Sequence, residues 1–245
     1  MKLNDLQRQR YARHLVLPEI REEGQEKLLG SKVLVIGAGG LGSPAAFYLA
    51  AAGVGTLGIM DGDVVELSNL QRQILHTTES LGSLKTGSAL ERIASLDPAV
   101  SVETYPCRLD EGNAPGILAR YDFVIDATDN FDSKFLIARA CHEAAKAWSH
   151  AGIRNFHGQT MTVLPGRSAC YRCVFHEDGA PRGGLPQGPL GALPGVIGSI
   201  QAIEAVKHLL GIGTLLTDAL LTFDALSMSF RKVTVRRDPA CPLCS

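Results

Sequence analysis

The chain has 245 residues, of which 45% are hydrophobic and 20% are charged, and its formal net charge is −1. This balance is typical of a soluble globular protein, and a nearly neutral chain gives no electrostatic reason to expect nucleic acid or an anionic membrane as a partner. The polar first residues are unlike a secretory signal and no apolar run is as long as a membrane span, so we expect a cytoplasmic location.

The first part of the chain is predicted to be helical. Residues 3–29 show apolar positions among charges, with a break at Pro18, and they carry Arg8, Arg10 and Arg13 close together. For each of these arginines the pattern alone favours a solvated basic face.

A glycine-rich loop follows a short apolar strand predicted over 33–36. The loop contains Gly37, Gly39, Gly40 and Gly42, and the residues after it predict a helix up to position 52. Glycines let the backbone approach an anion, and the amino terminus of a helix offers free N–H groups. The unit therefore predicts a phosphate-binding loop.

An acidic residue follows the next predicted strand, 56–60. Asp61 stands at about the spacing at which a carboxylate meets the ribose hydroxyls of a bound nucleotide. The polar segment 61–76 then lies at the carboxyl edge of the sheet, where open α/β sheets bind their ligands. Lys85 opens an amphipathic helix running to about residue 96 and is either a surface lysine or a phosphate contact.

Two carboxylates follow a later strand, 122–126. We expect Asp126 and Asp129 at its carboxyl end, on the same side as the glycine loop, where a carboxylate can hold Mg²⁺ on the phosphates of a nucleotide. Asp129 and Asn130 are also good helix N-cap residues, and the two roles can be divided between them.

The remaining elements continue the α/β pattern and add antiparallel strands near its end. Strands are predicted over 100–105, 147–151, 158–165, 219–225 and 228–236, helices over 113–120, 132–146 and 196–210, and a mobile loop or crossover segment over 179–195. We predict an α/β fold: a Rossmann-like, mainly parallel sheet with helices on both faces, extended by antiparallel strands.

Four cysteines form two CxxC pairs, Cys170 with Cys173 and Cys241 with Cys244. Four thiolates are the ligand set of a tetrahedral structural zinc site, which would join the last residues to the middle of the fold. A redox CxxC is the alternative for one pair, but two matched pairs favour zinc. The other two, Cys107 and Cys141, are expected to be ordinary buried residues.

These motifs, in this order, resemble the MoeB/ThiF/HesA family, bacterial relatives of the ubiquitin-activating enzymes, and within it the MoeB type. The likeness runs from about residue 6 to the end of the sequence. The matching segments are residues 10–13, 37–42, 61–63, 68–73, 82–85, 126–130, 170–173, 195–198 and 241–244.

The resemblance implies a nucleotidyltransferase that acts on MgATP. Its substrate would be the C-terminal glycine carboxylate of a ubiquitin-like sulfur-carrier protein of the MoaD or ThiS type, ending in Gly-Gly. The carboxylate attacks the α-phosphate, pyrophosphate leaves, and the acyl-adenylate accepts sulfur for molybdopterin, thiamin or related biosynthesis. The whole chain, 1–245, would be one adenylation domain. It would comprise a helical segment to about residue 30, a nucleotide-binding core to about 150, and a carrier-binding and zinc-bearing part.

The resemblance also assigns roles by position. The glycines of the loop would hold phosphate, Asp61 the ribose and Asp129 the Mg²⁺, with Asn130 beside it. Three residues would grip the phosphates: Asn69, Arg72 and Lys85. Arg13 matches the arginine that in this family reaches into the neighbouring protomer's site, which implies a homodimer.

One segment departs from the family pattern. Members that bind their carrier covalently hold a cysteine before the Gly-Val-Ile-Gly motif, and residues 181–194 contain none. The sequence also has no rhodanese-like segment after the second CxxC, so we expect a separate protein to donate the sulfur.

Three other functions stay open. The glycine loop and Asp61 alone would allow an NAD-dependent oxidoreductase, which leaves Arg72, Lys85, Asp129 and the paired cysteines without a purpose. A scaffold that binds a carrier without activating it is opposed by the intact charged set. Adenylation of a small-molecule or peptide carboxylate would use the same fold and the same residues.

Overall fold

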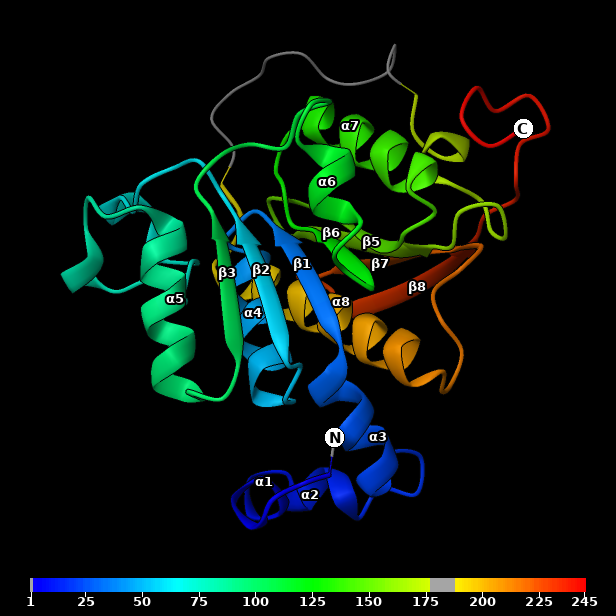
Figure 1. The fold of residues 1–245 in the computed structure, drawn as a ribbon. Coiled ribbons are helices and arrows are strands. Elements are labelled where there is room, and N and C mark those ends of the chain that lie inside the picture. Colours follow the sequence, from blue (N-terminus) through cyan, green and yellow to red (C-terminus); the bar gives the residue numbers. More distant parts are fainter. Residues whose placement is uncertain (1, 177–187) are drawn as a thin grey trace.

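The computed structural model describes residues 2–176 and 188–245, and its centre is one eight-stranded sheet (Figure 1). The strands lie in the order β3-β2-β1-β4-β5-β6-β7-β8. Their bounds are β1 Lys32–Ile36, β2 Thr56–Met60, β3 Ser101–Tyr105, β4 Phe123–Asp126, β5 Ala147–Arg154, β6 His157–Val163, β7 Ala219–Asp224 and β8 Ser229–Thr234.

Eight α-helices and three 3₁₀ helices accompany the sheet in the described residues. The α-helices are α1 Asp5–Arg10, α2 Ala12–Leu15, α3 Arg21–Gly30, α4 Gly42–Ala51, α5 Lys85–Leu96, α6 Ala114–Leu118, α7 Phe131–Glu143 and α8 Ala192–Leu210. The 3₁₀ helices are η1 Leu67–Asn69, η2 Thr78–Ser80 and η3 Tyr171–Cys173. No helix in this part of the chain combines the length and apolar character that crossing a membrane requires.

The first five strands of the sheet are parallel. β1 pairs with β2 on one side and with β4 on the other. The chain adds β2 and β3 on one side of β1 and then crosses over to add β4 and β5 on the other side, so the strand order reverses between β1 and β4. In open α/β sheets the crevice beyond the carboxyl ends of two such strands is the usual ligand site. The fold therefore directs attention to the loops that follow β1 and β4.

The last three strands are antiparallel. β5 pairs in parallel with β4 and antiparallel with β6, and β7 and β8 extend this half. A two-residue turn joins β5 to β6, and its first residue, Asn155, has a φ of 55°, a conformation that asparagine tolerates better than most residues. Thus β5 belongs to both halves of the sheet.

Each face of the sheet carries its own apolar core, as expected when strand side chains alternate between faces. On one face, residues such as Val33, Val35 and Leu57 pack with α4, α5 and α8. On the other, residues such as Leu34 and Trp148 pack with α6, α7 and the cysteine-bearing segment. Buried strands with apolar residues on both faces are typical of α/β folds.

The structure confirms the predicted fold class and shifts some boundaries. β5 runs to Arg154, and α8 begins at Ala192, four residues before its predicted start. The earlier start is possible because Pro194 falls in the first turn, where a missing N–H costs little. Residues 3–29 form three short helices, and most of the predicted loop 179–195 lies outside the described residues.

Candidate functional site

The glycine loop lies between β1 and α4 and depends on residues without a side chain. Gly37 has a φ of 99°, and a Cβ atom there would be 2.7 Å from the carbonyl oxygen of Ala127. A Cβ on Gly42 would be only 1.8 Å from the carbonyl oxygen of Gly37. No side chain caps the first turn of α4. The loop can therefore present backbone N–H groups to an anion.

A lysine and two carboxylates lie beside this loop. The Asp61 carboxylate accepts the backbone N–H of Ala38 at 2.8 Å and that of Asp63 at 2.8 Å. The Lys85 ammonium, on a side chain that is only 8% exposed, is 3.2 Å from Asp63 and 3.9 Å from Asp61. Burial opposes ionisation of Asp63, but the hydrogen bond and charge of Lys85 lower its pKa below the usual value. Lys85 is therefore not a surface lysine, and of the two alternatives the phosphate contact stays as the prediction.

The polar segment 61–76 folds over the glycine loop. The Asn69 side chain accepts the N–H of Glu66 at 3.1 Å and closes the turn of η1. The Arg72 guanidinium donates to the carbonyl of Ser68 at 3.2 Å, and its Cγ atom lies 3.4 Å from where a Cβ of Gly40 would stand. Asn69 and Arg72, two of the three predicted phosphate contacts, thus lie in the segment that covers the loop, and Arg72 is next to the loop.

Sequence reasoning missed one residue that supports the loop. His76 is buried, and its Nε2 lies 2.8 Å from the carbonyl oxygen of Ala38 while its Nδ1 lies 2.9 Å from the hydroxyl of Ser88. Burial lowers the pKa of His76, so the ring is neutral and one nitrogen donates to the loop carbonyl. No motif marks this residue, because its role follows from the tertiary packing of three segments.

The two carboxylates after β4 have different surroundings. Asp126 is fully buried, with Lys134 at 3.0 Å and His150 at 3.2 Å from its Oδ2 atom, so it is not available as a metal ligand. Complete burial would raise the pKa of Asp126, but the charge of Lys134 and the hydrogen bond from His150 lower it to about 2. Asp129 is exposed and makes no hydrogen bond or ion pair with other described residues. Asn130 is the N-cap of α7.

A cavity of about 1010 Å³ opens beside Asp129. The start of α7 and the side chain of Tyr171 lie on one side of it. The sheet provides the floor, including a row of register partners across four strands: Gly152, Gln159, Thr222 and Arg231. Each of these residues is on the strand face that carries His150, which also lines the cavity. The cavity therefore runs from the carboxyl edge of the parallel strands over the antiparallel half.

Arg13 lies far from the glycine loop of its own chain, at the opposite edge of the sheet. It is exposed on α2, and α1 to α3 pack at the amino edge of the sheet (Figure 1). The Tyr11 hydroxyl is 2.8 Å from Asp97, the residue after α5, and Arg10 donates to the Leu96 carbonyl. An Arg13 in this place cannot join the glycine loop of the same chain.

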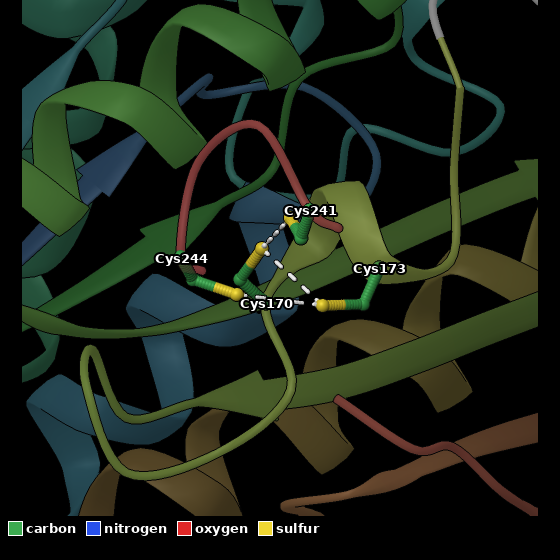
Figure 2. A group of neighbouring side chains, drawn as sticks. All are labelled: Cys170, Cys173, Cys241 and Cys244. Carbon is green, nitrogen blue, oxygen red and sulfur yellow. Dashed lines mark hydrogen bonds between the residues drawn. The ribbon is translucent and has the colours of Figure 1, made fainter. Parts of the chain in front are cut away.

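The four paired cysteines lie together, with their sulfur atoms turned toward one another (Figure 2). Sγ of Cys170 is 3.7 Å from that of Cys173 and 3.5 Å from that of Cys241, and Cys173 is 3.5 Å from Cys244. A tetrahedral site with Zn–S bonds of about 2.3 Å has sulfur atoms about 3.8 Å apart. A disulfide needs about 2.05 Å, so the arrangement fits a metal and not a bridge. The backbone N–H of Asp238 also points to Cys173 Sγ at 3.5 Å.

The other two cysteines differ from each other. Cys141 is buried in α7 as predicted, and burial raises the pKa of its thiol beyond the normal range. Cys107 is exposed, so the prediction that it is buried is wrong. The reason is that β3 ends at Tyr105 and the chain leaves the core there.

Comparison with known proteins places the chain in a family. The model of the ThiF family matches residues 11–243, which is nearly the whole chain. The chain belongs to the ThiF family. This confirms the relationship that the motifs indicated.

Two curated relatives of this ThiF family chain cover almost all of it. A Thermus thermophilus protein named sulfur carrier protein adenylyltransferase is 47% identical over 244 residues, 96% of this chain and 90% of that protein. A Haloferax volcanii protein named SAMP-activating enzyme E1 is 45% identical over 248 residues, 100% of this chain and 91% of that protein. These names agree with the predicted adenylyltransferase class.

Solved structures share the ThiF family fold. A crystal structure of Escherichia coli MccB with MccA-N7isoASN matches with a TM-score of 0.86 at 20% identity, covering 98% of this chain and 75% of that one. A crystal structure of MccB with ATP matches with a TM-score of 0.82 at 20% identity, covering 99% of this chain and 75% of that one. At this identity the likeness concerns the fold alone.

Proposed function

We propose that this protein activates the C-terminal carboxylate of a ubiquitin-like sulfur-carrier protein as an acyl-adenylate, with release of pyrophosphate. The observation that carries the proposal is the arrangement at one sheet edge. A glycine loop with Lys85 and Arg72 beside it lies next to β4, and Asp129 stands where a large cavity opens. A site for a nucleotide and a site for a protein's extended end are thus adjacent, as an adenylation reaction requires. The names of the relatives support the choice of carrier.

The residues near the loop would share the work of binding ATP. Backbone N–H groups at Gly39, Gly40 and Gly42 would hold phosphate oxygens, and Asp61 would accept from the ribose hydroxyls. The Gly37 N–H donates to the Met60 carbonyl at 2.7 Å, so Gly37 would serve by the backbone conformation that it gives the loop. The cations of Arg72 and Lys85 would neutralise phosphate charge, and the neutral amide of Asn69 would donate a hydrogen bond to a phosphate oxygen. Lys85 would have to exchange part of its pairing with Asp63 for phosphate, a small change because Asp63 is half exposed.

Asp129, with Asn130 holding the helix end beside it, is suited to carry Mg²⁺. Its carboxylate is exposed and free of partners among the described residues, while Asn130 already caps α7. We therefore propose the division of roles that the sequence allowed, in which Asp129 binds the ion and Asn130 caps the helix. When bound, the ion would offset the negative charge of the phosphates as the carboxylate approaches.

Arg13 is proposed to act in a second copy of the chain. Its position at the amino edge keeps it from its own site, so it can contribute only across a homodimer. We further propose a cytoplasmic enzyme of one functional unit over residues 1–245, supplied with sulfur by a separate donor protein. The single continuous sheet supports the unity of the chain.

ATP–pyrophosphate exchange tests the proposed function. Labelled pyrophosphate should enter ATP when enzyme and MgATP are incubated with a sulfur-carrier protein ending in Gly-Gly. No label should enter with the same carrier lacking its last two glycines, or with ATP alone. The unfolding temperature should rise when MgATP is added and should not change when NAD is added. Absence of exchange across a panel of carriers would overturn the proposal.

We also expect no covalent bond between enzyme and carrier. The metal-site thiolates would be poor nucleophiles, Cys141 is buried with a raised pKa, and residues 181–194 contain no cysteine. Only Cys107 is an exposed thiol outside the metal cluster in the described residues. Mass spectrometry without reductant, after incubation with carrier and MgATP, should show both proteins at their own masses. A thiol-sensitive adduct that disappears in Cys107→Ser would contradict this expectation.

A further inference from the structure

Two polar atoms in the floor and wall of the cavity are buried without partners. They are Nε2 of His150 and the hydroxyl of Tyr171, and neither makes a hydrogen bond within the described residues. Both residues line the cavity, and their rings lie 4.8 Å apart. A buried polar atom without a partner is costly unless a ligand or a water supplies one.

The hydrogen-bond partner of Nδ1 determines whether Nε2 of His150 is a donor or an acceptor. Nδ1 of His150 lies 3.2 Å from the Asp126 carboxylate, which can only accept, so Nδ1 carries the proton. Asp126 stays ionised because Lys134 is 3.0 Å away and also buried. Burial lowers the pKa of His150 to about 4, so the ring is neutral at pH 7. Its Nε2 is then a bare acceptor facing the cavity.

The strand position next to this buried acceptor has no side chain. Gly152 follows His150 by two residues on β5 and so lies on the same face. A Cβ atom on Gly152 would stand 3.6 Å from His150 Nε2 and 3.5 Å from Nε2 of Gln159. Such a methyl group would fit without a clash, but it would occupy the space in front of both polar atoms.

We propose that His150 accepts, through Nε2, a hydrogen bond from a backbone N–H of the carrier's C-terminal segment, in the space left by Gly152. This rests on the proposed function. An extended peptide presents N–H and C=O groups alternately, which matches one acceptor in His150 and one donor in the Tyr171 hydroxyl. A carboxylate has no proton to give to Nε2, so the reacting end of the carrier must lie elsewhere, toward Asp129. His150 is thus a substrate-positioning residue.

Two variants separate this role from a structural one. In His150→Asn the amide nitrogen takes the place of Nδ1 and keeps Asp126 paired, while the acceptor at Nε2 is lost. Gly152→Ala fills the space and leaves His150 intact. The matched controls are His142→Asn, whose unpartnered Nδ1 lies outside the cavity, and Gly116→Ala on α6, where a Cβ meets nothing within 4 Å.

The first measurement is pyrophosphate exchange. It uses the Gly-Gly carrier with which the wild-type enzyme is active. His150→Asn and Gly152→Ala should each raise the KM for the carrier about tenfold, roughly the effect of one neutral hydrogen bond. The KM for ATP should stay at the wild-type value in both variants, and all parameters of the controls should be unchanged. His150→Asn should unfold at a lower temperature because its buried ring packs on Tyr171, whereas Gly152→Ala should keep the wild-type unfolding temperature. Replacing one amide near the carrier's C-terminus by an ester should raise the carrier KM of the wild type about tenfold. The same replacement should leave the carrier KM of His150→Asn almost unchanged.

The second measurement needs no turnover. ¹⁵N spectra of histidine-labelled enzyme at pH 7 should show an unprotonated Nε2 for His150, identified by its absence in His150→Asn, and this signal should move when carrier is added. A protonated Nε2, or an unchanged carrier KM in both variants, would overturn the inference and show that the cavity atoms bind only water. The proposed function would stand in that case, because it fails only if the wild type shows no exchange.

Discussion

Asp129→Ala is expected to slow carrier-dependent pyrophosphate exchange by at least about a hundredfold while the protein remains folded. A contact made to developing charge in a preorganised site is worth about 3 kcal/mol, which corresponds to that factor. Asp126 cannot replace it, because Asp126 is buried and held by Lys134 and His150. Stability should be unaffected, since the N-cap of α7 is Asn130.

The measurement is exchange as a function of Mg²⁺ concentration, together with thermal unfolding. Asp132→Ala is the matched control, because it removes an equal charge from the first turn of the same helix. We expect the control to keep wild-type exchange. The Asp129 variant should need much more Mg²⁺ for any residual activity. Near-normal exchange in Asp129→Ala would remove the residue from the proposed metal site.

Loss of one cysteine ligand is expected to lower the unfolding temperature by at least about 10 °C. We propose that Cys170, Cys173, Cys241 and Cys244 hold one structural Zn²⁺, since the four sulfur atoms lie within 4.8 Å of one another. The cluster is part of the core that contains Trp148 and α7, so opening it exposes packed surface. A loss of about 4 kcal/mol, at a few degrees per kcal/mol for a chain of this size, gives the shift.

Cys241→Ser tests this expectation, with Cys107→Ser as the control because Cys107 is an exposed thiol outside the cluster. Metal analysis of fresh protein should give one zinc per chain in the wild type and the control. Chelation should lower the stability of the wild type to that of Cys241→Ser. Metal content far below one per chain, with equal stability of all three proteins, would exclude the site. A structural role further requires that Cys241→Ser keeps exchange at temperatures where it is folded.

Much of the fold is predictable from the sequence because its signals are local. The strand before Gly37 is apolar and short, and the glycines and the CxxC pairs have fixed spacing along the chain. The glycine pattern indicates a backbone geometry and the CxxC pattern indicates a ligand set. Each of these properties depends on a few residues that are close together in the sequence. The amino-acid sequence alone therefore predicts the cysteine cluster and the glycine loop.

The missed features depend on contacts between distant segments. The sequence predicts Asp126 at the ligand-binding edge, but its side chain turns inward to Lys134 on α7 and His150 on β5. Cys107 is predicted to be buried, yet the chain leaves the core after Tyr105. Local sequence contains neither the depth of a side chain nor its partners, and so it gives no sign of the unpartnered Nε2 of His150.

The two-residue turn after β5 has a consequence for which side chains reach the cavity. In a strand, moving the register by one position exchanges the two faces. A one-residue slip of β6 against β5 would turn Gln159 away from the cavity and bring a neighbour such as Gly158, which faces α8, onto the face that lines it. The positive φ of Asn155 sets the tight turn and so helps to fix the pairing of Arg154 with His157. A backbone conformation at the tip of a hairpin thus contributes to which β6 side chains line a cavity that extends well away from it.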